Sequence, residues 1–300
     1  MKVLRAKSAG FCWGVERAID IAREYAQKGR HPVYTDGPLI HNRQMMEVLT
    51  GEGIREVGDY RSQDKLTVTP ATAAAAVMVV RAHGISPDRR QYLKSLGMEF
   101  RDATCPDVGI IAGKVRMHAK KGFRTVIFGD PQHPEVIGLL GYAEGQGHVI
   151  SGPADIDALP DLGDKVCMVS QSTMFTDEFE RLAAHLRTRF PSALIFDTIC
   201  GATKDRQSDV VELRRQGCEA IVVIGGRHSA NTGETRQTGR ITRAALLPRG
   251  DRRRTRLRRV RAFRRRRGHR GGLDPGFSDR RGLSPARGLV LKPFLGRFPW

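Results

Sequence analysis

The chain has 300 residues, a hydrophobic fraction of 40% and a formal net charge of +19. This length allows two or three compact domains, and no apolar run approaches the roughly 20 residues that span a bilayer, so we expect neither a transmembrane protein nor a membrane partner. The amino-terminal residues MKVLRAKSAG lack the apolar core of a secretion signal, and five widely spaced cysteines predict a reducing cytoplasm instead of a disulfide framework.

The positive charge is concentrated at one end of the chain. Residues 233–300 contain 20 Arg, one Lys and four acidic residues. The whole chain has 51 basic and 32 acidic residues, which leaves 30 and 28 for residues 1–232. The first 232 residues are therefore close to neutral, and any function that depends on net charge belongs to the tail.

The first 232 residues alternate between helical and strand patterns. Residues 13–29 predict a helix that ends at Gly29, and residues 177–190 predict another before Pro191. Four apolar runs predict buried parallel strands, namely AVMVVRAHG, RTVIFGD, KVCMVSQST and EAIVVIGG. Strands alternating with helices predict an α/β fold with parallel sheets.

Three cysteines recur at nearly equal spacing. Cys12, Cys105 and Cys200 are 93 and 95 residues apart, and each follows a predicted strand. For any one cysteine, burial in a core is the simpler interpretation, and we keep it for Cys167 and Cys218. Three similar α/β units could instead bring the three thiols to one centre, where three ligands leave one iron of an iron–sulfur cluster open.

Three histidines each follow an apolar run, at the point where the strand pattern ends. His41, His83 and His133 are therefore expected to face a cleft, where imidazoles suit a phosphate group, although a single histidine in such a place is more often structural. Glu135 is a candidate proton donor if burial raises its pKa. Ser172 and the HSANT segment, with Ser229 and Asn231, add donors, and that segment resembles a helix amino terminus.

Eight motifs resemble the 4-hydroxy-3-methylbut-2-enyl diphosphate reductase family in order and spacing: GFCWGVERAI, PLIHNRQ, RAHGIS, DATCPDV, HPEVIG, SQST, DTICGATKDRQ and HSANT. The resemblance covers residues 1–232 and implies one [4Fe–4S] cluster per chain on Cys12, Cys105 and Cys200. It implies that the substrate's diphosphate contacts the three histidines and residues 229–231, and that Glu135 delivers the proton with which the hydroxyl leaves. Ser172 stands where the family usually has threonine, and Ala230 where many members have serine.

The same resemblance implies a domain organisation and an electron source. It implies three α/β domains around a central cluster: residues 13–104, residues 105–199, and residues 1–12 together with 200–232, the last one incomplete. The implied reaction is the reductive dehydroxylation that ends the non-mevalonate isoprenoid pathway. The implied electron donor is a reduced carrier such as ferredoxin or flavodoxin.

The arginine-rich tail, residues 233–300, has three interpretations. It is a nucleic-acid-binding segment, a disordered basic tail, or an out-of-frame translation of an ordinary reductase gene. We expect the third, and no nucleic-acid partner, because a one-base shift permits TAGASTP, a family motif, in place of HRGGLDP, and an acidic stretch in place of DRRRTRL. The chain is then expected to be poorly folded in its last third and weak or inactive.

Two further hypotheses stay open at this point. The first is a degenerate α/β core that carries a nucleic-acid-binding tail, and salt-sensitive binding of DNA or RNA would favour it. The second is a different iron–sulfur enzyme that acts on another diphosphate, which substrate turnover would distinguish.

Overall fold

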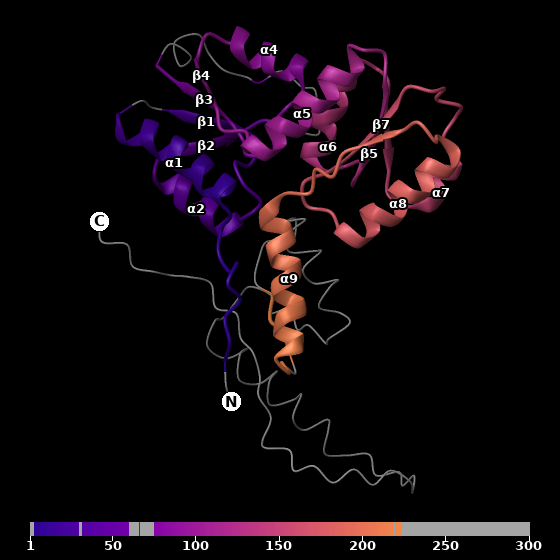
Figure 1. Ribbon diagram of the computed structural model, residues 1–300. Helices are drawn as coiled ribbons and strands as arrows, with labels where there is room; N and C mark the ends of the chain where they lie inside the picture. Colours follow the sequence, from indigo (N-terminus) through magenta and orange to yellow (C-terminus); the bar gives the residue numbers. More distant parts are fainter. Residues whose placement is uncertain (1–2, 30–31, 60–65, 67–74, 219, 224–300) are drawn as a thin grey trace, which may run out of the picture.

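The structure is a computed structural model that describes residues 3–29, 32–59, 66, 75–218 and 220–223 (Figure 1). The expected diphosphate contacts Ser229, Ala230 and Asn231 lie outside the described residues, as does the arginine-rich tail with its frameshift interpretation. The division into three domains stays a prediction.

The first sheet has four parallel strands in the order β2-β1-β3-β4. Its strands are β1 (Val33–Asp36), β2 (Ile54–Val57), β3 (Val77–Val80) and β4 (Glu99–Asp102). One face packs on α1 and α2 and the other on α4. These helices are α1 (Trp13–Gln27), α2 (Arg43–Gly51) and α4 (Pro87–Ser95).

The second sheet is also parallel and repeats this strand order as β6-β5-β7-β8. Its strands are β5 (Arg124–Phe128), β6 (Gly147–Ile150), β7 (Val166–Ser170) and β8 (Leu194–Ile195). One face packs on α5 and α6 and the other on α7 and α8. These helices are α5 (Pro106–Ala119), α6 (Pro134–Leu140) with the short 3₁₀ helix η1 (Gly141–Ala143), α7 (Pro153–Asp157) and α8 (Thr176–Arg189). The predicted α/β class with parallel sheets is confirmed.

Local sequence explains where two of the helices form. The apolar positions predicted for α1 face the first sheet, with Ala18, Ile19 and Ala22 buried in its core. In α8, Phe179, Leu182 and Leu186 are buried, and acidic residues occupy the first turn while arginines occupy the last, which suits the helix dipole.

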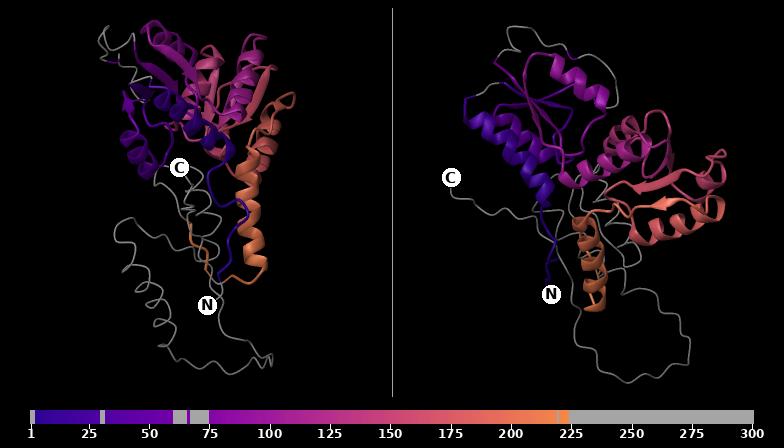
Figure 2. Two further views of the ribbon diagram at one scale, coloured as in Figure 1. Left: turned by 90° about the vertical axis from the view of Figure 1, so that its left-hand side faces the viewer. Right: turned by 45° about the horizontal axis from the view of Figure 1, so that its top comes forward.

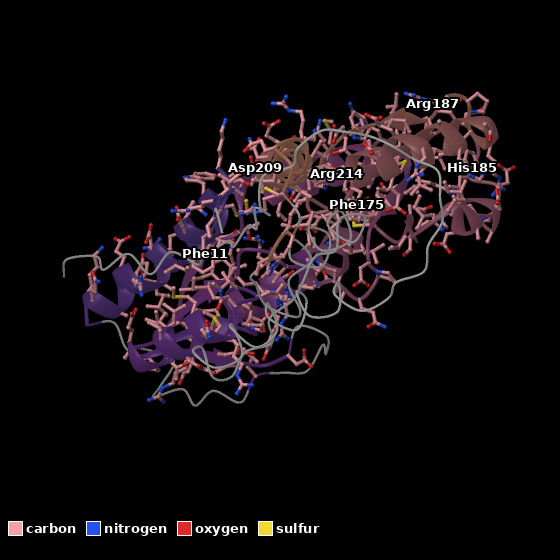
Figure 3. The ribbon with its side chains drawn as sticks, turned by 90° about the horizontal axis from the view of Figure 1, so that it is seen from below. Phe11, Phe175, His185, Arg187, Asp209 and Arg214 are labelled. Atoms are coloured by element: carbon pink, nitrogen blue, oxygen red, sulfur yellow. The ribbon has the colours of Figure 1, made fainter. Side chains whose placement is uncertain are left out.

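A separate apolar cluster lies below the two sheets. It joins the amino-terminal segment to α9 (Gly201–Arg215) and to residues 220–223. Its buried members are Ala6, Val210, Leu213, Ile221 and Val223. In Figures 1 and 2 the amino-terminal segment runs beside α9, and in the view from below α9 is seen end-on between the helices of the two sheets (Figure 3). Ser8 fixes this pairing, because its amide N–H and its hydroxyl both donate to Asp209 Oδ2 at 2.7 Å.

The structure differs from one predicted strand and describes only part of another. The strand expected just before Cys12 is wrong, because residues 3–12 form turns and pack on α9 through side chains without joining a described strand ladder. In the expected strand EAIVVIGG only residues 220–223 are described, with an isolated bridge at Val222.

Among the described residues, no helix has the length and apolar character to cross a membrane.

Candidate active site

The candidate residues gather where each parallel sheet reverses its strand order. In the first sheet the reversal lies between β1 and β3, and His41 follows β1 while His83 follows β3. In the second it lies between β5 and β7, and His133 follows β5 while Ser172 follows β7. Loops at the carboxyl ends of neighbouring strands diverge at such a point and leave a crevice for a ligand. This is why histidines so far apart in the sequence approach one another.

The three histidines form one compact group. The ring centroids of His41 and His83 are 4.4 Å apart, and that of His133 lies 5.6 and 5.4 Å from them. One ring nitrogen of each lies within 4.8 Å of the other two. Nδ1 of His83 is buried and has no hydrogen-bond partner among the described residues. A buried polar atom of this kind marks room for a ligand.

All the titration shifts resolved in this group favour neutral imidazoles. Burial, the other histidines and Arg81 lower the pKa of His83 well below its usual range. Burial first, then His41 and Arg81, lower the pKa of His133 to about 3. His133 Nδ1 accepts the amide N–H of Glu135 at 3.2 Å, so the proton of its neutral ring resides on Nε2. The ring is thereby set to donate to an acceptor such as a phosphate oxygen.

Arg81 decides between an anion and a metal ion as the ligand. Three clustered imidazoles also form a set that suits Zn²⁺. Arg81 is only 2% exposed, and its charge acts on both His83 and His133. A buried positive charge beside the group opposes a divalent cation and attracts an anion, although Arg81 also interacts with the carboxylate of Glu56, which weakens the effect. The electrostatics therefore favour an anion.

Glu135 is a buried carboxyl group whose hydrogen-bond partner among the described residues is Ser172. It is 1% exposed, and its Oε1 accepts the amide N–H of Ser172 at 2.6 Å while its Oε2 accepts the Ser172 hydroxyl at 2.7 Å. Burial raises the pKa of Glu135 to about 7, although the two bonds from Ser172 act in the opposite direction. A carboxyl group with a pKa near neutrality is suited to general acid catalysis.

The three candidate cysteine ligands occupy equivalent places. Cys12, Cys105 and Cys200 are the N-cap residues of α1, α5 and α9. The pKa values of the Cys105 and Cys200 thiols are raised, first by burial and in smaller part by the nearby Cys12 thiol. The Cys105 and Cys200 thiols therefore both lie near the Cys12 thiol. Helix amino termini, with their free N–H groups, favour negative charge such as that of metal-bound thiolates.

Backbone hydrogen bonds connect the cysteines to the strand-end loops. The Cys200 amide N–H donates to the Ser172 carbonyl at 2.9 Å, so one residue holds both Glu135 and the segment carrying Cys200. The Cys105 amide N–H donates to the Ala82 carbonyl at 2.9 Å, beside His83. The thiols and the histidines thus belong to one framework. Three convergent thiols of this kind fit a four-iron cluster that keeps one iron open.

The structure also shows residues that the sequence did not single out. Arg81 directly follows an apolar run, where an arginine usually marks the exposed end of a strand. Only the tertiary structure shows that it is buried. Gly14 lies against the Cys105 thiol, a contact between residues distant in the sequence. Of the two cysteines assigned to cores, Cys167 is buried in β7, and Cys218 is half-buried against the cluster below the sheets.

Comparison with known proteins identifies the family. A sequence model described as LytB protein matches residues 3–246. The chain belongs to the LytB protein family. The match to LytB extends the resemblance to residue 246, beyond Thr232, where the motifs alone placed its end.

Relatives and solved structures agree with this family. A 4-hydroxy-3-methylbut-2-enyl diphosphate reductase from Opitutus terrae is 69% identical over 242 residues, covering 80% of this chain and 83% of that protein. One from Alkaliphilus oremlandii is 38% identical, covering 77% and 79%. The solved E-1-hydroxy-2-methyl-but-2-enyl-4-diphosphate reductase from Plasmodium falciparum is 28% identical with a TM-score of 0.74, covering 82% of this chain and 76% of that one.

Proposed function

We propose that the active site of this chain is built for the reduction of (E)-4-hydroxy-3-methylbut-2-enyl diphosphate to isopentenyl and dimethylallyl diphosphate, the last step of the non-mevalonate pathway, and that the 300-residue chain as written performs it weakly or not at all. The observation that carries the proposal is the grouping of three histidines, of which His83 and His133 are neutral, beside Arg81 and beside Glu135, a carboxyl group that is half-protonated near neutral pH. Membership of the LytB family, whose closely matching relatives bear the name of this reductase, supports the same substrate.

The histidine group would bind the diphosphate end of the substrate. Each imidazole donates one N–H to a phosphate oxygen, and the positive charge of Arg81 strengthens these bonds in a site of low dielectric constant. Because His41 and His83 lie on loops of the first sheet and His133 on a loop of the second, a bound diphosphate bridges the two sheets. Ser229, Ala230 and Asn231 are proposed to complete this contact.

Glu135 would supply the proton for the leaving hydroxyl group. Removing the hydroxyl as water takes up two electrons and two protons in total, one proton on the departing oxygen and one on the carbon chain. Ser172 holds Glu135 through both carboxyl oxygens, which fixes the direction from which its proton leaves. Burial keeps a large fraction of Glu135 protonated up to a pH of about 7.

Cys12, Cys105 and Cys200 would hold one [4Fe–4S] cluster per chain. When bound, such a cluster passes single electrons from a reduced carrier such as ferredoxin or flavodoxin, and its open iron acts as a Lewis acid toward the hydroxyl oxygen. The surrounding protein contributes the burial that excludes water from the reacting groups.

Substrate turnover tests the proposal in two matched proteins. One is the 300-residue chain, and the other is a frame-restored chain, in which codons from 233 onward are read one base later. Both are reconstituted anaerobically with iron and sulfide and assayed with a chemical reductant. We expect turnover in the frame-restored chain and weak or absent turnover in the 300-residue chain. Absence of turnover in both overturns the proposed function, and equal turnover in both overturns the frameshift interpretation.

A further inference from the structure

The first turn of α1 packs directly against the Cys105 thiol. Gly14 is buried, and a Cβ atom added to it would collide with Cys105 Sγ and lie 3.1 Å from Cys105 Cβ. Gly14 has ordinary helical backbone angles, so an alanine here would suffer no backbone strain and would favour the helix. Glycine at position 14 therefore lets the first turn of α1 approach the Cys105 thiol this closely.

Neighbouring hydrogen bonds prevent the Cys105 segment from moving away. Arg17 Nη1, one turn along α1, donates to the Thr104 carbonyl at 3.1 Å. The Cys105 amide N–H donates to the Ala82 carbonyl at 2.9 Å. Both bonds hold the peptide group between Thr104 and Cys105, and on the other side the Cys105 carbonyl accepts the Gly109 amide N–H at 2.9 Å, so an added methyl group would displace the Cys105 side chain itself.

We propose that Gly14 is a positioning residue for the iron–sulfur cluster. The same helical turn carries Cys12 at its N-cap and, two residues later, sets the place of the Cys105 thiol through Gly14. The spacing between two cluster ligands is thus fixed by close packing of one helix on the other ligand. This inference rests on the proposed cluster, because Cys105 is assigned as a ligand on that ground.

The chain offers matched control positions on α5, the helix that begins at Cys105. Gly109 and Gly113 are helical glycines with no atom within 4 Å of an added Cβ. G109A and G113A add the same methyl group in open space, and alanine is the better helix former. Any effect of G14A that these variants lack therefore arises from the contact with Cys105.

The test uses the full chain in two forms. In the reconstituted form, iron is measured during competition with a chelator, and we expect G14A to hold its iron roughly 10-fold or more weakly than the unaltered chain, as displaced support of a metal ligand usually does. In the iron-free form, we expect a changed alkylation rate of Cys105, measured by peptide mass spectrometry, and unchanged rates of Cys167 and Cys218. G109A and G113A should match the unaltered chain in both assays.

The outcomes separate this inference from the proposed function. If G14A holds iron and reacts at Cys105 as the unaltered chain does, Gly14 has no positioning role. If the unaltered chain binds no iron, the cluster assignment fails, and the alkylation comparison still decides whether Gly14 positions the thiol. A global folding defect is distinguished by thermal melting of G14A, C105A and the double variant, because a collision with Cys105 makes G14A less harmful in the C105A background.

Discussion

The sheet β2-β1-β3-β4 and the sheet β6-β5-β7-β8 have the same topology, yet the loops at their reversal points carry different side chains. The first presents His41 and His83, with the buried charge of Arg81 acting on His83, which suits an anion. The second presents Glu135 held by Ser172, which suits proton transfer. His133 lies beside Glu135 in the sequence but groups with the first pair. One topology thus supplies two kinds of chemistry through its loops alone.

The largest expected effect lies on the second sheet. Glu135→Gln keeps the size of the side chain but removes its acidic proton, so we expect turnover of the frame-restored chain to fall by about 100-fold or more. Affinity of the same variant for inorganic pyrophosphate, measured by calorimetry, should change little, because the histidine group remains. Glu180→Gln, on the exposed side of α8, is the control. If the pyrophosphate affinity of E135Q fell as much as its turnover, the two sheets would not divide the chemistry in this way.

The second prediction concerns the first sheet. Arg81→Gln removes the buried charge beside the histidines, and we expect the affinity for inorganic pyrophosphate to fall roughly 10-fold or more. Arg81→Lys keeps the charge and should retain most of the affinity. Calorimetric titration with Zn²⁺ is the complementary measurement, because loss of the Arg81 charge should strengthen binding of a cation at the same group. Unchanged pyrophosphate affinity in R81Q would contradict the anion assignment.

The third prediction concerns the pH dependence of Glu135. Since burial raises its pKa from 4.5 to about 7, the folded chain binds this proton more tightly than the unfolded chain. The resulting stabilisation is present below pH about 4.5 and is lost as the pH rises through about 7. Carboxyl ¹³C NMR of the folded chain should show one glutamate that titrates near 7 and is missing in E135Q. A chain in which every glutamate titrates near 4.5 would exclude Glu135 as an acid at neutral pH.

The smallest effect is expected for the hydroxyl group of Ser172. Ser172→Ala removes one of the two hydrogen bonds that favour the charged form of Glu135, so the pKa of Glu135 should rise further. Ser172→Thr keeps a hydroxyl group and should leave the titration nearly unchanged. The same NMR titration measures both variants, and a lower pKa in S172A would mean that the hydroxyl group acts mainly through another residue.

Much of the two sheet units could be predicted from the sequence. The spacing of Ala18, Ile19 and Ala22 predicts α1 correctly, because burial of one face follows directly from helical periodicity. Strand-end histidines predict a common crevice because parallel strands share a carboxyl edge. The strand expected before Cys12 is wrong, because a strand depends on hydrogen-bonded neighbours that a local pattern does not reveal.

The remaining features of the site depend on tertiary contacts. Burial of Arg81 and the approach of Gly14 to Cys105 join residues from different elements, and no local pattern encodes such distances. The raised pKa of Glu135 likewise depends on burial of the carboxyl group in the folded chain, where it contacts Ser172 from another loop. Sequence reasoning therefore finds the candidate groups, and the fold determines their ionisation and spacing.

Iron content after anaerobic reconstitution tests the central claim most directly. Cys12→Ser, Cys105→Ser and Cys200→Ser are each expected to lose most of the iron and sulfide that the unaltered chain binds, together with the visible absorbance of the cluster. Cys218→Ser, at the half-buried cysteine below the sheets, should retain both. Full iron content in any of the first three variants would contradict a cluster held by these three helix N-caps.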